Sequence, residues 1–184
     1  MLEQSCSDAL QLINAGLFSG RLAVNLSPTQ FHRSSFLATL QQALTMVGLP
    51  PRHLELELTE GILMKDTDGA VDILHALRDM GIATAIDDFG TGFSSLSYLR
   101  ALPIDKIKID RSFIKDVTEN EKDAAVCKGV IALANELDLI AVAEGIETRA
   151  QFDALRGFGC ELFQGYWFAR PMAVEPLEEW LRAR

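Results

Sequence analysis

Residues 54–59 read Leu-Glu-Leu-Glu-Leu-Thr, so leucine and glutamate alternate strictly along this stretch. A period of two predicts a β-strand, because successive side chains of a strand point to opposite faces. We expect the leucines to pack under helices, and Glu55 and Glu57 to share the other, polar face. The stretch therefore predicts a sheet that is apolar on one side and polar on the other.

Five further stretches have strand character, and they alternate with amphipathic helical patterns. These predicted strands are Leu22–Leu26, Ile82–Asp87, Ile104–Ile109, Ile140–Glu144 and Leu162–Phe168. Strict alternation of strand and helix predicts a parallel sheet with right-handed crossovers. An open doubly wound sheet and a closed barrel both fit this order. Because the inner faces become polar toward the C-terminal ends of the strands, the barrel is favoured.

The barrel is expected to be incomplete. A full eight-stranded barrel typically needs about 250 residues, whereas these 184 residues supply six strands and open on a helical stripe from Leu2 to Ala15. We predict an α/β fold, a TIM-like (β/α) barrel with six of eight strands that lacks the first two. Residues 1–184 are expected to form a single domain. Capping boxes are predicted to open two helices, at Thr118 with Glu121 and at Thr148 with Gln151.

The charge and composition indicate which kinds of partner the protein binds and in which cellular compartment it lies. The formal net charge is −9 and the pI is near 4.8, which argues against binding to long nucleic acid. No apolar run is long enough for a membrane span, and Met1–Asp8 lacks the basic start of a signal peptide. Three cysteines without pair spacing suit a reducing compartment. The sequence therefore predicts a cytoplasmic protein or the cytoplasmic part of a larger signalling protein.

Polar and mostly acidic side chains collect where the predicted strands end. They are Asn25, Glu57, Glu60, Asp87, Asp88, Lys108, Asp110, Glu144, Glu147 and Gln164. Carboxylates crowded on one rim repel one another unless cations neutralise them. Oxygen ligands of this kind suit Mg²⁺ or Mn²⁺, and a pair of such ions is a standard device for hydrolysing phosphodiesters. A single lysine among the acids is suited to orient the attacking water.

Six short strings give the rim a family resemblance. They are N-L-S-P (Asn25–Pro28), E-L-T-E (Glu57–Glu60), D-D-F-G-T-G-F-S-S-L (Asp87–Leu96), I-K-I-D (Ile107–Asp110), A-E-G-I-E (Ala143–Glu147) and Q-G-Y (Gln164–Tyr166). Together they closely resemble the EAL domains, bacterial phosphodiesterases that open cyclic di-GMP to the linear dinucleotide pGpG. The resemblance covers essentially the whole chain and keeps the six strings in the family's order.

The resemblance implies a role for each rim residue. The implied metal ligands, for two Mg²⁺ or Mn²⁺ ions, are Asn25, Glu57, Asp87, Asp88 and Glu144. The implied catalytic residues are Lys108, Glu144 and Asp88, with Lys108 holding the catalytic water. The implied loop and pocket residues are Glu60, Asp110, Glu147 and Gln164, with Glu60 fastening the loop Asp88–Leu96.

The E-A-L string itself does not occur in this sequence. In the family it lies on an earlier strand and its glutamate is a metal ligand, so two functions stay open. One is a cyclic di-GMP phosphodiesterase, and the other is a catalytically silent module that binds cyclic di-GMP or a protein. A third, a barrel lyase using Lys108 as a Schiff-base nucleophile, needs a depressed lysine pKa, which the surrounding acids oppose. The unpaired edges of the first and last strands predict a homodimer or other self-association.

Overall fold

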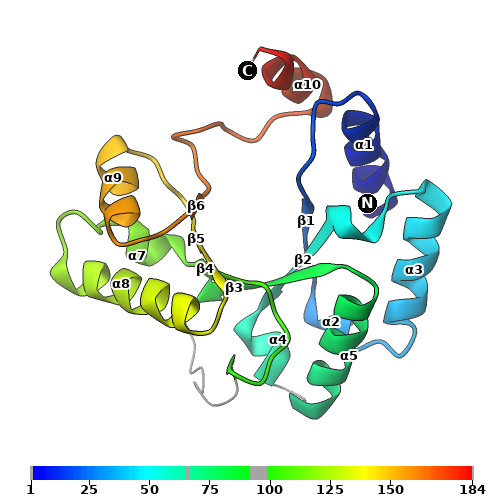
Figure 1. Ribbon diagram of the computed structural model, residues 1–184, viewed down its shortest axis with the longest axis horizontal. Coiled ribbons are helices and arrows are strands. Elements are labelled where there is room, and N and C mark those ends of the chain that lie inside the picture. Colours follow the sequence, from blue (N-terminus) through cyan, green and yellow to red (C-terminus); the bar gives the residue numbers. More distant parts are fainter. Residues whose placement is uncertain (1, 65–66, 92–98, 184) are drawn as a thin grey trace.

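The sheet has six parallel strands that follow one another in the order of the sequence. The computed structural model describes residues 2–64, 67–91 and 99–183. Its strands are β1 (Leu22–Asn25), β2 (Leu54–Thr59), β3 (Ala83–Phe89), β4 (Lys106–Ile109), β5 (Ile140–Ala143) and β6 (Leu162–Phe163). Figure 1 shows them as an open arc with helices along its outer side. The predicted incomplete α/β barrel is confirmed.

Helices connect the strands and cover the outer face of the arc. In the described residues they are α1 (Leu2–Asn14), α2 (Pro28–Phe31), α3 (Phe36–Val47), α4 (Glu60–Met64), α5 (Thr67–Asp79), α7 (Arg111–Lys115), α8 (Glu121–Glu136), α9 (Arg149–Gly157) and α10 (Val174–Arg182), with a short 3₁₀ turn at Pro51–His53. Both ends of the chain lie near the gap of the arc, where α10 and α1 meet (Figure 1). None of the described helices combines the length and apolar character that crossing a bilayer requires.

The core lies between the outer face of the sheet and the helices. Leu54, Leu56 and Leu58 of β2 are almost completely buried, as are Ile107 and Ile109 of β4. Burying one such side chain contributes roughly 1.5–3 kcal/mol. The leucines of the alternating stretch therefore fix which face of β2 packs against the helices, and they place its glutamates on the inner face of the arc.

The last strand is shorter than predicted. The apolar run Leu162–Phe168 forms a strand only at Leu162–Phe163, because the chain then turns onto the loop that follows β5. Ile146 N donates to Gln164 O, and Trp167 N donates to Ile146 O. Of the remaining aromatic residues, Phe168 packs against Phe152 at 5.9 Å between ring centroids, and Tyr166 and Trp167 are exposed.

One predicted capping box is confirmed and the other is wrong. The Thr148 side chain accepts from Gln151 N at the start of α9, and Gln151 reaches back to Thr148 N. At α8 the cap is Asn120 rather than Thr118, since the Asn120 side chain accepts from Lys122 N at 3.0 Å. Asparagine two residues later competes successfully for the free N–H groups of the first turn.

The three cysteines are free and buried, as the sequence suggested. Burial raises the pKa of Cys127 and of Cys160 to about 11. Thiols with such a high pKa are almost entirely protonated at neutral pH and are poor nucleophiles. These cysteines therefore act as small core side chains.

Candidate functional site

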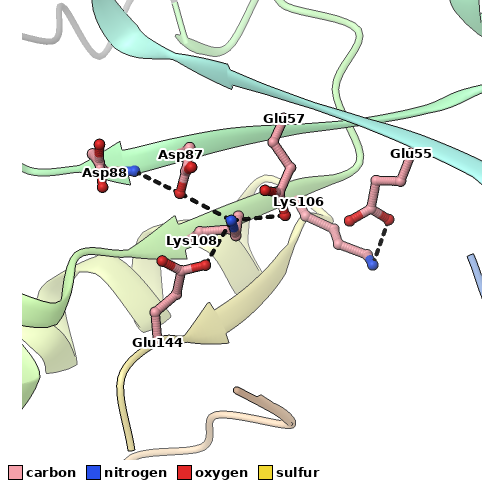
Figure 2. Close-up of polar contacts among 7 residues, drawn as sticks. All are labelled: Glu55, Glu57, Asp87, Asp88, Lys106, Lys108 and Glu144. Carbon is pink, nitrogen blue, oxygen red and sulfur yellow. Dashed lines mark hydrogen bonds and ion pairs between the residues drawn. The ribbon is translucent and has the colours of Figure 1, made fainter. Parts of the chain in front are cut away.

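Lys108 on β4 lies at the centre of a group of carboxylates on the inner face of the arc. Its ammonium nitrogen Nζ is 2.7 Å from Glu57 Oε1, 3.0 Å from Asp87 Oδ1 and 2.6 Å from Glu144 Oε1. Figure 2 shows the carboxylates arriving from three directions, with Glu57 on β2, Asp87 on β3 and Glu144 just after β5. Four predicted site residues thus meet at one point.

Small residues on β3 allow this arrangement. β3 lies between β2 and β4 in the sheet, and Ala83 and Ala85 are register partners of Glu55 and Glu57. Neighbouring strands are about 4.8 Å apart, so a side chain on β4 must cross β3 to reach β2. Alanine leaves the space above β3 free, and Lys108 fills it with only 5% of its side chain exposed. The alanines of β3 are therefore part of how the sequence builds the site.

The acids keep Lys108 charged. Burial by itself would lower the pKa of Lys108, but hydrogen bonds and charge from Glu144 and Glu57 outweigh it and raise the pKa above the ordinary lysine value. A lysine in this state donates hydrogen bonds and stabilises negative charge, and it does not accept a proton at neutral pH. The arrangement opposes Schiff-base chemistry, which needs a neutral amine.

Three carboxylates form an oxygen-rich cluster beside Lys108. Carboxylate oxygens of Asp87, Asp88 and Glu144 all lie within 4.8 Å of one another. Burial comes first in raising the pKa of Glu144, with Asp87 and Glu57 adding to it and Lys108 opposing it. Partial desolvation and the charge of Asp87 likewise raise the pKa of Asp88. These shifts record burial first and repulsion between the acids second, and a bound cation would offset both.

The end of β3 places two consecutive aspartates at this cluster. The register of β3 against β4 shifts between Ile86 and Phe89, and Asp88 has a φ of 54°, in the left-handed region that aspartate tolerates better than most residues. Asp88 N donates to Asp87 Oδ1 at 3.0 Å. Because of this irregularity, consecutive residues approach one cluster instead of alternating across the sheet.

Glu60 and Asp110 hold backbone near the cluster. Glu60 Oε1 accepts from Gly90 N at 2.8 Å, so it contacts the start of the predicted loop Asp88–Leu96. Residues 92–96 of that loop lie outside the described residues. Asp110 accepts from Ser112 N and thereby caps α7. Although burial opposes it, hydrogen bonds from Ser112 lower the pKa of Asp110, and its contact with Asp88 acts in the same direction.

The other predicted residues lie farther out. Asn25 is exposed at the end of β1, as the register partner of Glu57. Gln164 follows β6 and lines an open pocket of about 660 Å³ along the inner face, together with Glu57 and Lys108. Glu147 forms an exposed ion pair with Arg111 rather than contacting the acidic cluster. The predicted site residues thus divide into a buried group around Lys108 and a peripheral group of Asn25, Glu147 and Gln164.

Two ion pairs, one on the inner face and one exposed, were not predicted from the sequence. Lys106 pairs with Glu55 at 2.6 Å, one step below the Lys108 group (Figure 2). Arg111 is the partner of Glu147. The alternation that puts Glu55 with Glu57, and Lys106 with Lys108, on one face was visible in the sequence, but the pairing across β3 was not.

The donor set fits a divalent metal ion. Asp87, Asp88 and Glu144 offer only carboxylate oxygens within a short span, and hard cations such as Mg²⁺, Mn²⁺ and Ca²⁺ prefer oxygen ligands. Burial raises the pKa of Glu144 and of Asp88, and repulsion from neighbouring carboxylates adds to it even with Lys108 present. The residues present are therefore suited to hold such a cation.

Comparisons with known proteins agree with this chemistry. The cyclic di-GMP phosphodiesterase NbdA of Pseudomonas aeruginosa is 45% identical over 183 residues, which is 100% of this chain and 23% of NbdA. The solved PaMucR phosphodiesterase in complex with c-di-GMP superimposes with a TM-score of 0.92 at 41% identity, covering 96% of this chain and 71% of that one. Klebsiella pneumoniae BlrP1, solved with manganese and cyclic di-GMP, has a TM-score of 0.82 at 35% identity over 92% of this chain and 43% of that one.

The chain spans about a quarter of the length of the curated relatives it matches. Its sequence matches the model of one protein family, the EAL domain, over residues 1–171. With a fold and rim chemistry that agree, this chain belongs to the EAL domain family.

Proposed function

We propose that this chain hydrolyses cyclic di-GMP to linear pGpG as the phosphodiesterase domain of a bacterial second-messenger system. The observation that carries the proposal is the buried Lys108 ammonium held among Glu57, Asp87 and Glu144, beside an oxygen-rich cluster suited to a cation. Relatives of the same family are named cyclic di-GMP phosphodiesterases. The proposed domain spans residues 1–184.

We propose that two Mg²⁺ or Mn²⁺ ions serve the reaction. The residues that would hold them are Asn25, Glu57, Asp87, Asp88 and Glu144. Such ions supply charge stabilisation at the phosphate and activation of water when they are bound. The clustering of Asp87, Asp88 and Glu144 and their need for positive charge support this assignment.

Lys108 would position water and remain protonated throughout. Since its pKa is raised, Lys108 donates hydrogen bonds to the attacking oxygen or to the phosphate. In the net reaction, the water oxygen bonds to phosphorus, one P–O3′ bond breaks, and the 3′ oxygen leaves with a proton. Glu144 contacts Lys108 Nζ and shares the oxygen-rich cluster with Asp88, so we assign these two carboxylates to accept and return that proton.

The remaining rim residues would hold the loop that follows β3 and line the substrate pocket. Glu60 would hold the loop that begins at Gly90, and its hydrogen bond to Gly90 N supports this role. Asp110 would fix the start of α7 beside Asp88. Glu147 and Gln164 would complete the pocket wall for a guanine base.

A catalytically silent receptor for cyclic di-GMP is the second candidate. It is favoured by one specific observation, the exposure of Asn25 on an edge strand, because a ligand left exposed holds its cation weakly. In that case the pocket of about 660 Å³ would bind the dinucleotide without cleaving it.

We propose self-association through the strand edges, and a cytoplasmic setting. β1 and β6 each have one unpaired edge in the described sheet, and Leu162 on β6 is 40% exposed. Unpaired apolar edges favour pairing with another chain. The three buried free thiols fit a reducing compartment.

The deciding experiment is hydrolysis of cyclic di-GMP by the purified chain, first with Mg²⁺ and then with Mn²⁺. We expect pGpG as the product, and we expect Asp87→Ala to abolish it. Lys122→Met, on the exposed face of α8, is the control that should leave turnover unchanged. Binding of cyclic di-GMP without any pGpG would favour the silent receptor, and neither binding nor turnover would contradict both functions.

A further inference from the structure

A second ion pair lies below the Lys108 group, deeper along the same face. Lys106 Nζ is 2.6 Å from Glu55 Oε2, and the two side chains are only 14% and 6% exposed. Figure 2 shows this pair beside the Lys108 group, with no dashed line joining the two. Buried charges are costly to keep unless each finds a partner, so this pair requires an explanation.

The strand register offers Lys106 a different partner from the one it takes. Glu57 is the register partner of Ala85, and Ala85 is the register partner of Lys106. Lys106 is therefore level with Glu57 across the sheet, yet its ammonium group binds Glu55, one step deeper. Lys108 in the same way reaches back to Glu57.

Both lysines are therefore shifted by one step relative to the glutamates. Lys106 crosses β3 over Ala83 and Ala85, so no polar side chain of β3 decides which glutamate it meets. Lys108 also contacts Asp87 on β3, at the level of the rim. What separates the two layers is the set of charges itself. Because Lys106 is paired with Glu55, it does not bind Glu57, and Glu57 pairs with Lys108 instead.

We propose that Glu55 and Lys106 form a positioning pair that keeps Glu57 bound to Lys108. Without the Glu55 carboxylate, the Lys106 ammonium turns to Glu57 and competes with Lys108 for it. Without Lys106, the buried Glu55 carboxylate draws Lys108 away from the rim. The predicted effects on metal binding and turnover rest on the proposed function. The predicted placement of the side chains is independent of it.

The test compares Glu55→Gln, Lys106→Met, the double variant E55Q/K106M and the surface control Lys122→Met. Crystal structures of the metal-free variants show where the lysines go. We expect Lys106 within hydrogen-bonding distance of Glu57 in E55Q, and Lys108 turned toward Glu55 in K106M. The double variant should restore the original contacts of Lys108, because both competing groups are gone. Thermal melts confirm that each variant is folded.

Mn²⁺ titration followed by electron paramagnetic resonance gives the second readout. In E55Q a lysine competes for Glu57, so we expect Mn²⁺ to bind about tenfold more weakly and kcat to fall with a smaller change in KM. In the double variant, both values should return to within about threefold of the original chain. A purely stabilising pair would instead leave the double variant at least as impaired as E55Q.

Two outcomes separate the failure of this inference from the failure of the proposed function. If Lys108 keeps Glu57 in the E55Q and K106M structures, the positioning role is wrong, whatever the activity. If the original chain binds no Mn²⁺ while the lysines move as described, the metal-dependent function is wrong and the positioning pair stands.

Discussion

The centre of the sheet and its two edges differ in how far their side chains are buried and paired. On β2 and β4, Glu57 and Lys108 are 7% and 4% exposed and paired with each other. On the edges, Asn25 beside β2 is exposed, and Leu162 of β6 is 40% exposed. The side chains at the centre are therefore buried and paired within the chain, whereas those at the edges are exposed to solvent or to another molecule.

This difference separates two requirements of a rim site. The positive charge of Lys108 offsets part of the repulsion between Glu57, Asp87 and Glu144. The fold can therefore hold these acids together without a bound cation. The edges add ligands and pocket wall that the sheet does not itself enclose. Breaking the centre should therefore affect stability and chemistry together, and changing the edges should affect them separately.

The largest effect is expected for Lys108→Met. Removing the cation leaves Glu57, Asp87 and Glu144 buried together, which should cost about 3–5 kcal/mol in the free energy of unfolding near neutral pH. Lys108 opposes the rise in the pKa of Glu144, so without Lys108 the folded-state pKa of Glu144 lies still farther above its unfolded value. The cost from this carboxylate is therefore fully present above that raised pKa, and it shrinks as the pH falls through it.

Denaturant unfolding at neutral pH and at a series of lower pH values measures this difference between Lys108→Met and the original chain. Saturating Mn²⁺ should also reduce it, because the ion replaces part of the lost charge. In the original chain, where the acids are ionised, the stability that Lys108 provides is fully present below the ordinary lysine pKa of about 10.4, and it is lost as the pH rises through the raised folded-state pKa of Lys108. A difference that is independent of pH and Mn²⁺ would contradict the role of charge.

The next largest effect is expected at an edge, for Gly165→Ala. A Cβ at this position would overlap the backbone of Ile146, and backbone cannot move aside as a flexible side chain can. Overpacking of this kind costs about 1–3 kcal/mol. Gly129→Ala, in α8 with open space around it, is the matched control and should be neutral or slightly stabilising. Equal unfolding midpoints for the two variants would show that the turn after β6 adapts freely.

Removal of a helix cap outside the site should have a smaller effect. The Thr148 side chain accepts from Gln151 N at the start of α9, so Thr148→Ala is expected to cost about 1 kcal/mol. Thr45→Ala removes a hydroxyl that only donates to Gln41 O within α3, and should cost less than about 0.5 kcal/mol. Cyclic di-GMP turnover by both variants should match the original chain at a temperature where all are folded.

The same contrast explains what the sequence could predict. The bounds of β2 were predicted correctly because its leucines and glutamates alternate without interruption. The run Leu162–Phe168 was predicted too long, because an apolar run does not distinguish strand pairing from ring packing, and the turn at Gly165 depends on the loop after β5. Elements are thus most predictable where one face is buried and the other charged.

The site followed a similar rule. Residues with the right parity at strand ends, such as Asp87 and Lys108, were predicted to meet, and the structure brings them together. The pairing of Lys106 with Glu55 was missed because the strand register puts Lys106 level with Glu57, and its ammonium group reaches the glutamate one step away. The direction in which a long side chain crosses a neighbouring strand depends on the surrounding charges, and residue spacing within one strand does not encode it.

The smallest effect on folding, and a clear effect on assembly, is expected for Leu162→Lys. A charge on the unpaired edge of β6 opposes strand pairing with another chain, while an exposed substitution changes stability by only about 0.5 kcal/mol or less. Light scattering over a range of concentrations should show a lower average mass for Leu162→Lys than for the original chain. Met46→Lys, 68% exposed on α3 and away from both edges, introduces the same charge and should leave the mass unchanged. If both variants and the original chain scatter as monomers, the edges are covered in some other way, and the centre of the sheet alone holds this fold together.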